Sequence, residues 1–172
     1  YKGRGIKLIL DIAKLLPKKK FILYGKRKEN MDLDIIPKNV KIFNFVPFYK
    51  IPTILKKADL LLMPYSLSGV SINSERIDTS RYASPMKMFE YLASGVPFIS
   101  SNLKVLKEVL EHKSNCLIAR DNNPETWTKN IMMLDKKKKL KDKISYNAFK
   151  TALNNTWSKR VIKIVKWEKE SR

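Results

Sequence analysis

The sequence has few residues of several kinds, and each shortage excludes a class of protein. Cys116 is the single cysteine among 172 residues, so no disulfide can form within the chain and nothing indicates an oxidising compartment. The 5 Gly and 8 Pro are too few for a collagen-like or low-complexity chain. The longest apolar stretches, residues 60–64 and 96–99, fall far short of the ~20 residues that a membrane span needs. We therefore expect one soluble globular domain in the cytoplasm.

Acidic residues are also scarce, because 36 Lys and Arg face 16 Asp and Glu and leave a net charge of +20. The excess is concentrated at the two ends of the chain, in residues 1–30 and 136–172. Most of the basic residues are lysines, whereas recognition of bases and phosphates by paired hydrogen bonds favours arginine. We therefore expect no nucleic-acid partner. The alternative interpretation of the charge is a basic nucleic-acid-binding module.

Apolar residues alternate between strand-like runs and helix-like spacing along the chain. The pattern predicts strands at residues 21–24, 40–45, 60–64, 98–100 and 116–119, and helices at 5–16, 47–58, 84–95, 103–111, 124–134, 137–154 and 157–169. Asn102 and Asn123 precede two of these helices as candidate N-caps. Such alternation predicts an α/β fold with a parallel sheet covered by helices on both faces.

The helix predicted at residues 84–95 has clear signals at both ends. Ser84 suits the N-cap, Pro85 suits the first helical position, Gly95 suits the left-handed position after the last turn, and Pro97 prevents continuation. Lys87 lies in the first turn, where the helix dipole disfavours a cation, and a bound anion would reverse that effect. Glu90 follows three residues later, where a carboxylate can accept hydrogen bonds from ligand hydroxyls. The plainer interpretation is a surface ion pair between these two side chains.

Several segments together resemble the C-terminal, donor-binding domain of retaining GT-B fold glycosyltransferases of the group 1 type. The resemblance covers nearly the whole chain and rests on Arg4-Gly5-Ile6, Phe45-Val46-Pro47, Ala58-Asp59, Met63-Pro64-Tyr65, the run from Ser84 to Pro97, and Asn115-Cys116-Leu117. It implies a Rossmann-like domain over residues 1–172, one half of a GT-B fold. It also implies an enzyme that transfers a sugar, with retention, from a UDP- or GDP-linked donor, without a metal ion or another cofactor.

The resemblance implies a role for each of eight residues. Arg4 and Lys87 match the cations that stabilise the departing diphosphate, and Glu90 matches the glutamate that holds the ribose hydroxyls. The turn of Ser84, Pro85 and Met86 matches the diphosphate cradle, and Phe45 and Val46 match the loop beside the nucleobase. No metal ligands are implied.

The sequence departs from the family pattern at Tyr82, where many members carry a second glutamate near the sugar. Glu75 and Asp78 are weak candidates for that contact, and a degenerate, non-catalytic member used for protein contacts remains an alternative. Because the family's first central strand and acceptor domain have no counterpart here, we expect a piece of a longer protein that is inactive by itself. The helix within residues 156–172 is expected to pack on the missing N-terminal domain.

The resemblance also implies a saccharide or lipid-linked acceptor in cell-envelope or polysaccharide synthesis. Because such acceptors lie at membranes, Lys14, Lys18–Lys20 and Lys136–Lys139 are candidates for peripheral contact with an anionic inner leaflet. The alternative is that these lysines only solubilise the surface.

Five other conspicuous residues have simpler interpretations. His112 is expected to make a favourable contact at a helix C-terminus, and Cys116 to be a buried small hydrophobe. Trp127, Trp157 and Trp167 lie at helical spacing with aliphatic residues and are expected to be core.

Overall fold

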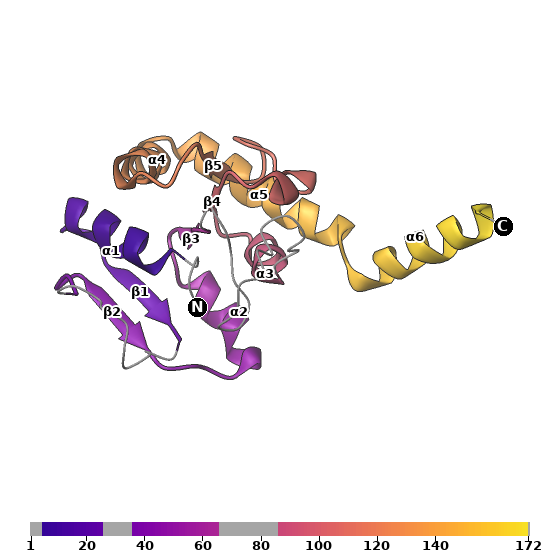
Figure 1. Cartoon of the computed structure of the whole chain (residues 1–172), viewed down its shortest axis with the longest axis horizontal. Coiled ribbons are helices and arrows are strands. Elements are labelled where there is room, and N and C mark those ends of the chain that lie inside the picture. Colours follow the sequence, from indigo (N-terminus) through magenta and orange to yellow (C-terminus); the bar gives the residue numbers. More distant parts are fainter. Residues whose placement is uncertain (1–4, 26–35, 66–85, 172) are drawn as a thin grey trace, which may run out of the picture.

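The computed structural model describes residues 5–25, 36–65 and 86–171 of the chain. Strands alternate with helices and short 3₁₀ segments, labelled η (Figure 1). The elements are α1 (Ile6–Leu15), β1 (Phe21–Tyr24), β2 (Val40–Phe43), η1 (Phe48–Lys50), α2 (Ile51–Lys56), β3 (Leu61–Met63), α3 (Met86–Ser94), β4 (Phe98–Ser101), η2 (Lys104–Glu108), β5 (Leu117–Ala119), α4 (Pro124–Lys136), α5 (Lys138–Asn154) and α6 (Trp157–Glu170).

The described strands are all paired in parallel. β1 pairs with β2, and β4 lies between β3 and β5 in a second sheet. Each parallel pair requires a crossover connection between its strands. The expected α/β fold, with parallel strands and helices on both faces, is confirmed. It differs in one respect, because the described strands form two sheets in place of a single one.

Alternate residues of β3 divide between two hydrophobic clusters, one on each face. Leu62 packs against the first cluster, whereas Leu61 and Met63 belong to the second. Successive side chains of a strand point to opposite faces, so this division places helices on both sides. Among the described residues, no helix is both long and apolar enough to cross a bilayer.

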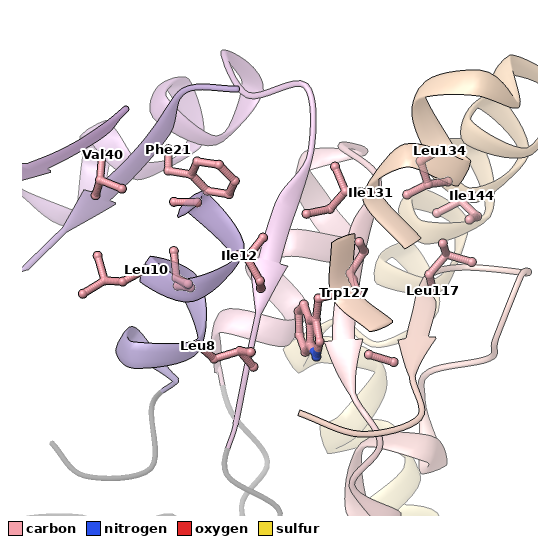
Figure 2. Packing of buried hydrophobic residues seen from close by; sticks show 14 residues of the cluster. Leu8, Leu10, Ile12, Phe21, Val40, Leu117, Trp127, Ile131, Leu134 and Ile144 are labelled. Atoms are coloured by element: carbon pink, nitrogen blue, oxygen red, sulfur yellow. The ribbon is translucent and has the colours of Figure 1, made fainter. Parts of the chain in front are cut away.

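The first cluster lies beneath α1 and α4, which pack against each other. Ile12 of α1, Leu117 of β5 and Trp127 of α4 are fully buried in it, and Figure 2 shows Trp127 among these side chains. The Trp127 indole Nε1–H donates to the carbonyl of Asp121 at 2.9 Å, so the one polar group of this side chain is satisfied. The expectation that Trp127 is core is confirmed.

The second cluster lies beneath α3 and α5, which also pack against each other. Met88 and Leu92 project from α3 at a spacing of four, which places them on one side of the helix. They pack with Phe98 of β4 and Ala148 of α5. This packing fixes α3, and with it the residues on its other side, against the three-stranded sheet.

Two predicted helix termini are confirmed and one is wrong. Gly95 has a φ of +66°, as its position after α3 predicts, and Asn123 accepts a hydrogen bond from the Glu125 amide at 2.9 Å as the N-cap of α4. The helix expected at residues 103–111 is instead the short 3₁₀ segment η2. Leu103 occupies its N-cap position without a side-chain bond, so Asn102 caps nothing there.

Helix α6 contradicts the expectation that Trp157 and Trp167 are core residues. Their side chains are 75% and 69% exposed, and no residue of α6 is buried. Thr156 caps the helix by accepting a hydrogen bond from the Lys159 amide at 3.3 Å. Helical spacing of apolar residues predicts an amphipathic helix, but it does not say whether a described part of the same chain covers that face.

Candidate functional site

The carboxyl ends of β3, β4 and β5 are joined by a small polar network. Tyr65, two residues after β3, donates its backbone N–H to Ser101 Oγ at 2.8 Å, and Asn122 Nδ2 donates to the Tyr65 carbonyl at 2.9 Å. Ser101 is the last residue of β4, and Asn122 follows β5. Open parallel sheets bind ligands outside this edge, so the network fixes the floor of the candidate site.

The start of α1 closes against the same edge. Gly5 precedes α1 with a φ of +66°, and a Cβ atom at this position would lie 2.5 Å from Cβ of Pro64, the residue after β3. Only glycine adopts this backbone without strain and leaves room for Pro64. Gly5 therefore holds the α1 N-terminus directly against the end of β3.

Helix α3 carries three of the predicted site residues. Met86 is its first described residue and is exposed, while Lys87 in the first turn and Glu90 one turn later are half-buried. The spacing of three places Lys87 and Glu90 on the same side of the helix. A cation and a carboxylate thus lie one turn apart, close to the helix start.

Tyr91 connects this helix to β3 and to the polar network. Its hydroxyl lies 3.4 Å from the Leu62 carbonyl, to which it donates, and its ring meets the Phe98 ring edge-on at 5.9 Å. Burial raises the pKa of the Tyr91 hydroxyl, and the neighbouring Tyr65 and Glu90 raise it further. Glu90 is therefore near enough to Tyr91 to act on its ionisation.

Phe45 and Val46 follow β2, in the other sheet. The Phe45 side chain is 77% exposed and Val46 is half-buried. Helix α2, which follows them through η1, packs beside α3. The structure thus gathers Met86, Lys87 and Glu90 on one helix and places Phe45 and Val46 after a strand of the two-stranded sheet.

The remaining predicted site residues lie outside the described residues. These are Arg4, Ser84 and Pro85, together with Tyr82, Glu75 and Asp78, which bear on the sugar contact.

His112 differs from its prediction, and Cys116 agrees with it. Segment η2 ends at Glu108, so His112 is not at a helix terminus, and its Nδ1 accepts the Ile118 N–H at 3.0 Å. Partial burial lowers the pKa of His112, and the nearby Lys113 lowers it further. Cys116 is fully buried, and burial raises the pKa of its thiol to about 12, which keeps it unreactive.

Sequence reasoning missed Tyr65, Ser101 and Asn122. Their signal was present, because each lies at or just after the carboxyl end of a predicted strand, where polar side chains meet a ligand or each other. Only the strand order shows that the three ends are adjacent.

A family model described as "Glycosyl transferases group 1" matches residues 2–136, which is most of the chain. The chain belongs to the group 1 glycosyltransferases. No curated protein sequence matches it significantly.

Solved structures of other glycosyltransferases share the fold. HepE of Anabaena in complex with UDP superposes with a TM-score of 0.76 at 15% identity, over 100% of this chain and 46% of HepE. The C-terminal domain of the group 1 protein LpcC of Francisella tularensis gives 0.69 at 17% identity, over 90% of this chain and 80% of that one. A glycosyltransferase of Rickettsia africae gives 0.74 at 15% identity, over 99% and 45%. This group 1 chain thus spans less than half the length of HepE.

Proposed function

We propose that the chain is the C-terminal, donor-binding half of a retaining glycosyltransferase that uses a UDP- or GDP-linked sugar. One observation carries the proposal: Lys87 and Glu90 lie one turn apart near the start of α3, and this helix connects the parallel strands β3 and β4, so it begins at their carboxyl edge. The fold neighbour HepE, crystallised with UDP-glucose and with UDP, supports a nucleotide-sugar donor.

The mechanism assigned to these residues is electrostatic. When the bond between the sugar and the diphosphate breaks, negative charge grows on the leaving phosphate oxygens. The N–H groups of the α3 start and the Lys87 ammonium stabilise that charge, and Arg4 acts with them. Ser84, Pro85 and Met86 form the diphosphate cradle. In this proposal the cations of the chain stabilise the leaving diphosphate, so the reaction requires no metal ion or further cofactor.

The other end of the nucleotide is held by neutral and acidic groups. The Glu90 carboxylate accepts hydrogen bonds from the two ribose hydroxyls, which are a pair of donors suited to its two oxygens. Phe45 and Val46 contact the nucleobase. The exposure of Phe45 leaves most of its ring available for a planar base.

The acceptor is assigned to the remainder of a longer protein. We place an N-terminal acceptor domain there, because the chain covers 46% of HepE, and the chain alone is then inactive. The apolar face of α6, within residues 156–172, packs on that domain. Its exposed Trp157, Val161, Ile164 and Val165 recur at positions i, i+4, i+7 and i+8, which form one stripe.

The proposed acceptor is a saccharide or a lipid-linked saccharide of cell-envelope or polysaccharide synthesis. We place the enzyme in the cytoplasm, in peripheral contact with the inner face of an anionic membrane. Support for that contact comes from Lys19, which pairs with Asp135 and so brings the Lys18–Lys20 turn beside the Lys136–Lys139 cluster.

Titration calorimetry with UDP and GDP tests the donor site. One of the two nucleotides is expected to bind and to raise the melting temperature, because a ligand that binds only the folded state stabilises it. Failure of both to bind would leave the basic nucleic-acid-binding module as the alternative. Binding without sugar transfer by the complete protein would favour the non-catalytic member that Tyr82 suggests.

A further inference from the structure

The two faces of the β1–β2 sheet differ in what covers them. Phe21 and Val40 are buried in the cluster beneath α1, which lies on one side of β1 and β2 (Figure 1). On the opposite face, Ile22 pairs with Lys41 across the strands, and Tyr24 pairs with Phe43. These four residues, all exposed, form the open face. No described element covers it.

The open face is an ordered apolar surface. The Tyr24 and Phe43 rings stack with centroids 5.3 Å apart and an interplanar angle of 22°. Their side chains are nevertheless 44% and 45% exposed, and Ile22 is 57% exposed. Large apolar side chains that gather on one exposed sheet face mark an interaction surface more strongly than scattered ones do.

Lysines surround the amino end of this face. Lys41 lies on it, and Lys20 precedes β1 by one residue, at the alternation that places it on the same side as Ile22 and Tyr24. The turn that contains Lys18 and Lys19 leads into β1. The Nδ2 of Asn39 donates hydrogen bonds to the carbonyls of Ala13 and Lys19, each at 2.9 Å. These bonds fix the backbone beside the turn, and the neighbouring Lys38 is therefore held at the same end of the sheet.

The lysines near this end come from three separate parts of the sequence. The Lys19–Asp135 pair brings the Lys136–Lys139 cluster beside the same turn. Segments 14–20, 38–41 and 136–139 contain no arginine. Compact ammonium groups around an aromatic apolar surface suit anionic headgroups above an apolar layer.

We propose that the open face docks on an anionic lipid surface, with Tyr24 and Phe43 at the level of the headgroups and Lys18, Lys20, Lys38 and Lys41 against their phosphates. Ile22 and the two aromatic rings lose exposed apolar area in this contact. A nucleic-acid backbone offers no apolar layer in which they could be buried. The inference names the surface for the membrane contact that is part of the proposed function.

Vesicle sedimentation tests the proposal with matched variants. The chain is expected to bind vesicles of phosphatidylcholine and phosphatidylglycerol at low salt, to leave them near ~0.5 M salt, and not to bind phosphatidylcholine alone. Tyr24→Ser/Phe43→Ser is expected to lower the partition coefficient at least about tenfold. The control Tyr146→Ser/Phe149→Ser removes two exposed aromatic side chains from α5 and is expected to leave binding within about twofold.

Melting temperatures confirm that each variant is folded. If Tyr24→Ser/Phe43→Ser does not fold, Lys20→Glu/Lys41→Glu reverses two charges on the same face and is expected to abolish binding to the anionic vesicles. No vesicle binding at low salt, or equal losses in the open-face and α5 variants, would overturn the proposal. Retention on duplex DNA or RNA without vesicle binding would also overturn it, in favour of nucleic acid.

The same variants separate this inference from the donor site. UDP or GDP affinity in Tyr24→Ser/Phe43→Ser is expected to equal that of the unmodified chain. Vesicle binding without nucleotide binding would contradict the proposed donor site and support docking of the open face. Nucleotide binding without vesicle binding would contradict docking of the open face and support the donor site.

Discussion

Gly5 and Pro64 approach so closely that a single methyl group on Gly5 would lie 2.5 Å from the Pro64 Cβ and 2.8 Å from the Pro64 carbonyl oxygen. Gly95 has the same φ of +66°, but a Cβ there meets nothing nearer than 3.9 Å. The two glycines therefore share a backbone conformation and differ in the space around them.

Gly5→Ala is expected to destabilise the fold more than Gly95→Ala. The left-handed conformation costs a non-glycine residue about 1–2 kcal/mol at either position. At Gly5 the clash with Pro64 adds about 1–3 kcal/mol, as overpacking does elsewhere. Urea unfolding of the two variants measures the difference. Equal losses would show that α1 and β3 can move apart without cost.

Glu90→Ala is expected to weaken nucleotide diphosphate binding by about 1–3 kcal/mol, because hydrogen bonds to a charged carboxylate are lost. Glu90 is half-buried and not part of either hydrophobic cluster, so the melting temperature should change little. Titration calorimetry with UDP and GDP measures the effect, with Glu108→Ala, an exposed carboxylate of η2, as the control. Unchanged affinity in Glu90→Ala would remove this residue from the site.

Lys87→Ala is expected to weaken binding of the nucleoside diphosphate and to leave binding of the nucleoside alone nearly unchanged. The reason is that the lysine at the α3 start is assigned to the phosphates. Arg4→Ala is expected to show the same pattern, and Lys104→Ala in η2 neither effect. Parallel calorimetry with uridine and UDP, or guanosine and GDP, checks this. Equal losses for both ligands would contradict the assignment.

Trp127→Ala is expected to destabilise the chain by about 3–5 kcal/mol, because it opens a cavity in the cluster beneath α1 and α4. Trp157→Ala is expected to stay within about 0.5 kcal/mol, since this side chain is exposed on α6. Chemical denaturation of both variants provides the comparison. A large loss in Trp157→Ala would mean that α6 packs against the described domain in solution.

His112 is expected to make stability depend on pH. Its pKa is lowered in the folded chain, so the unfolded chain binds a proton first as the pH falls. The stabilisation is complete above the unfolded pKa of about 6.5 and is lost as the pH falls through the lower folded value. A protonated Nδ1 can no longer accept the Ile118 N–H. Urea midpoints between pH 7 and 5 should fall more steeply than those of His112→Asn, and parallel curves would contradict the prediction.

The sequence predicts best where a local rule decides the structure. Gly95 and Asn123 are examples, because a left-handed residue and an N-cap need only their own neighbours. The bounds of most helices and strands follow from apolar spacing for the same reason. Lys87 and Glu90 could be placed on one side of a helix in advance, because three residues make nearly one turn.

Features that depend on distant residues could not be predicted. The meeting of Tyr65, Ser101 and Asn122 depends on strand order. Trp157 and Trp127 have similar sequence surroundings, yet one is exposed and the other buried. Lys19 and Asp135 lie more than a hundred residues apart, and no local pattern in either segment predicts their contact.

Helix α6 has 14 residues and no buried side chain, so its stability within the described chain depends on its own hydrogen bonds, its Thr156 cap and exposed side-chain contacts such as Lys166–Glu170. Isolated helices of this length are marginal in water, so we expect α6 to exchange between helical and unwound states. Any surface that binds the apolar stripe binds only those molecules in which α6 is helical. The apparent affinity of that surface for the chain is therefore the intrinsic affinity multiplied by the helical fraction. Ordering of α6 and docking of its stripe thus form one coupled equilibrium, in which each step favours the other.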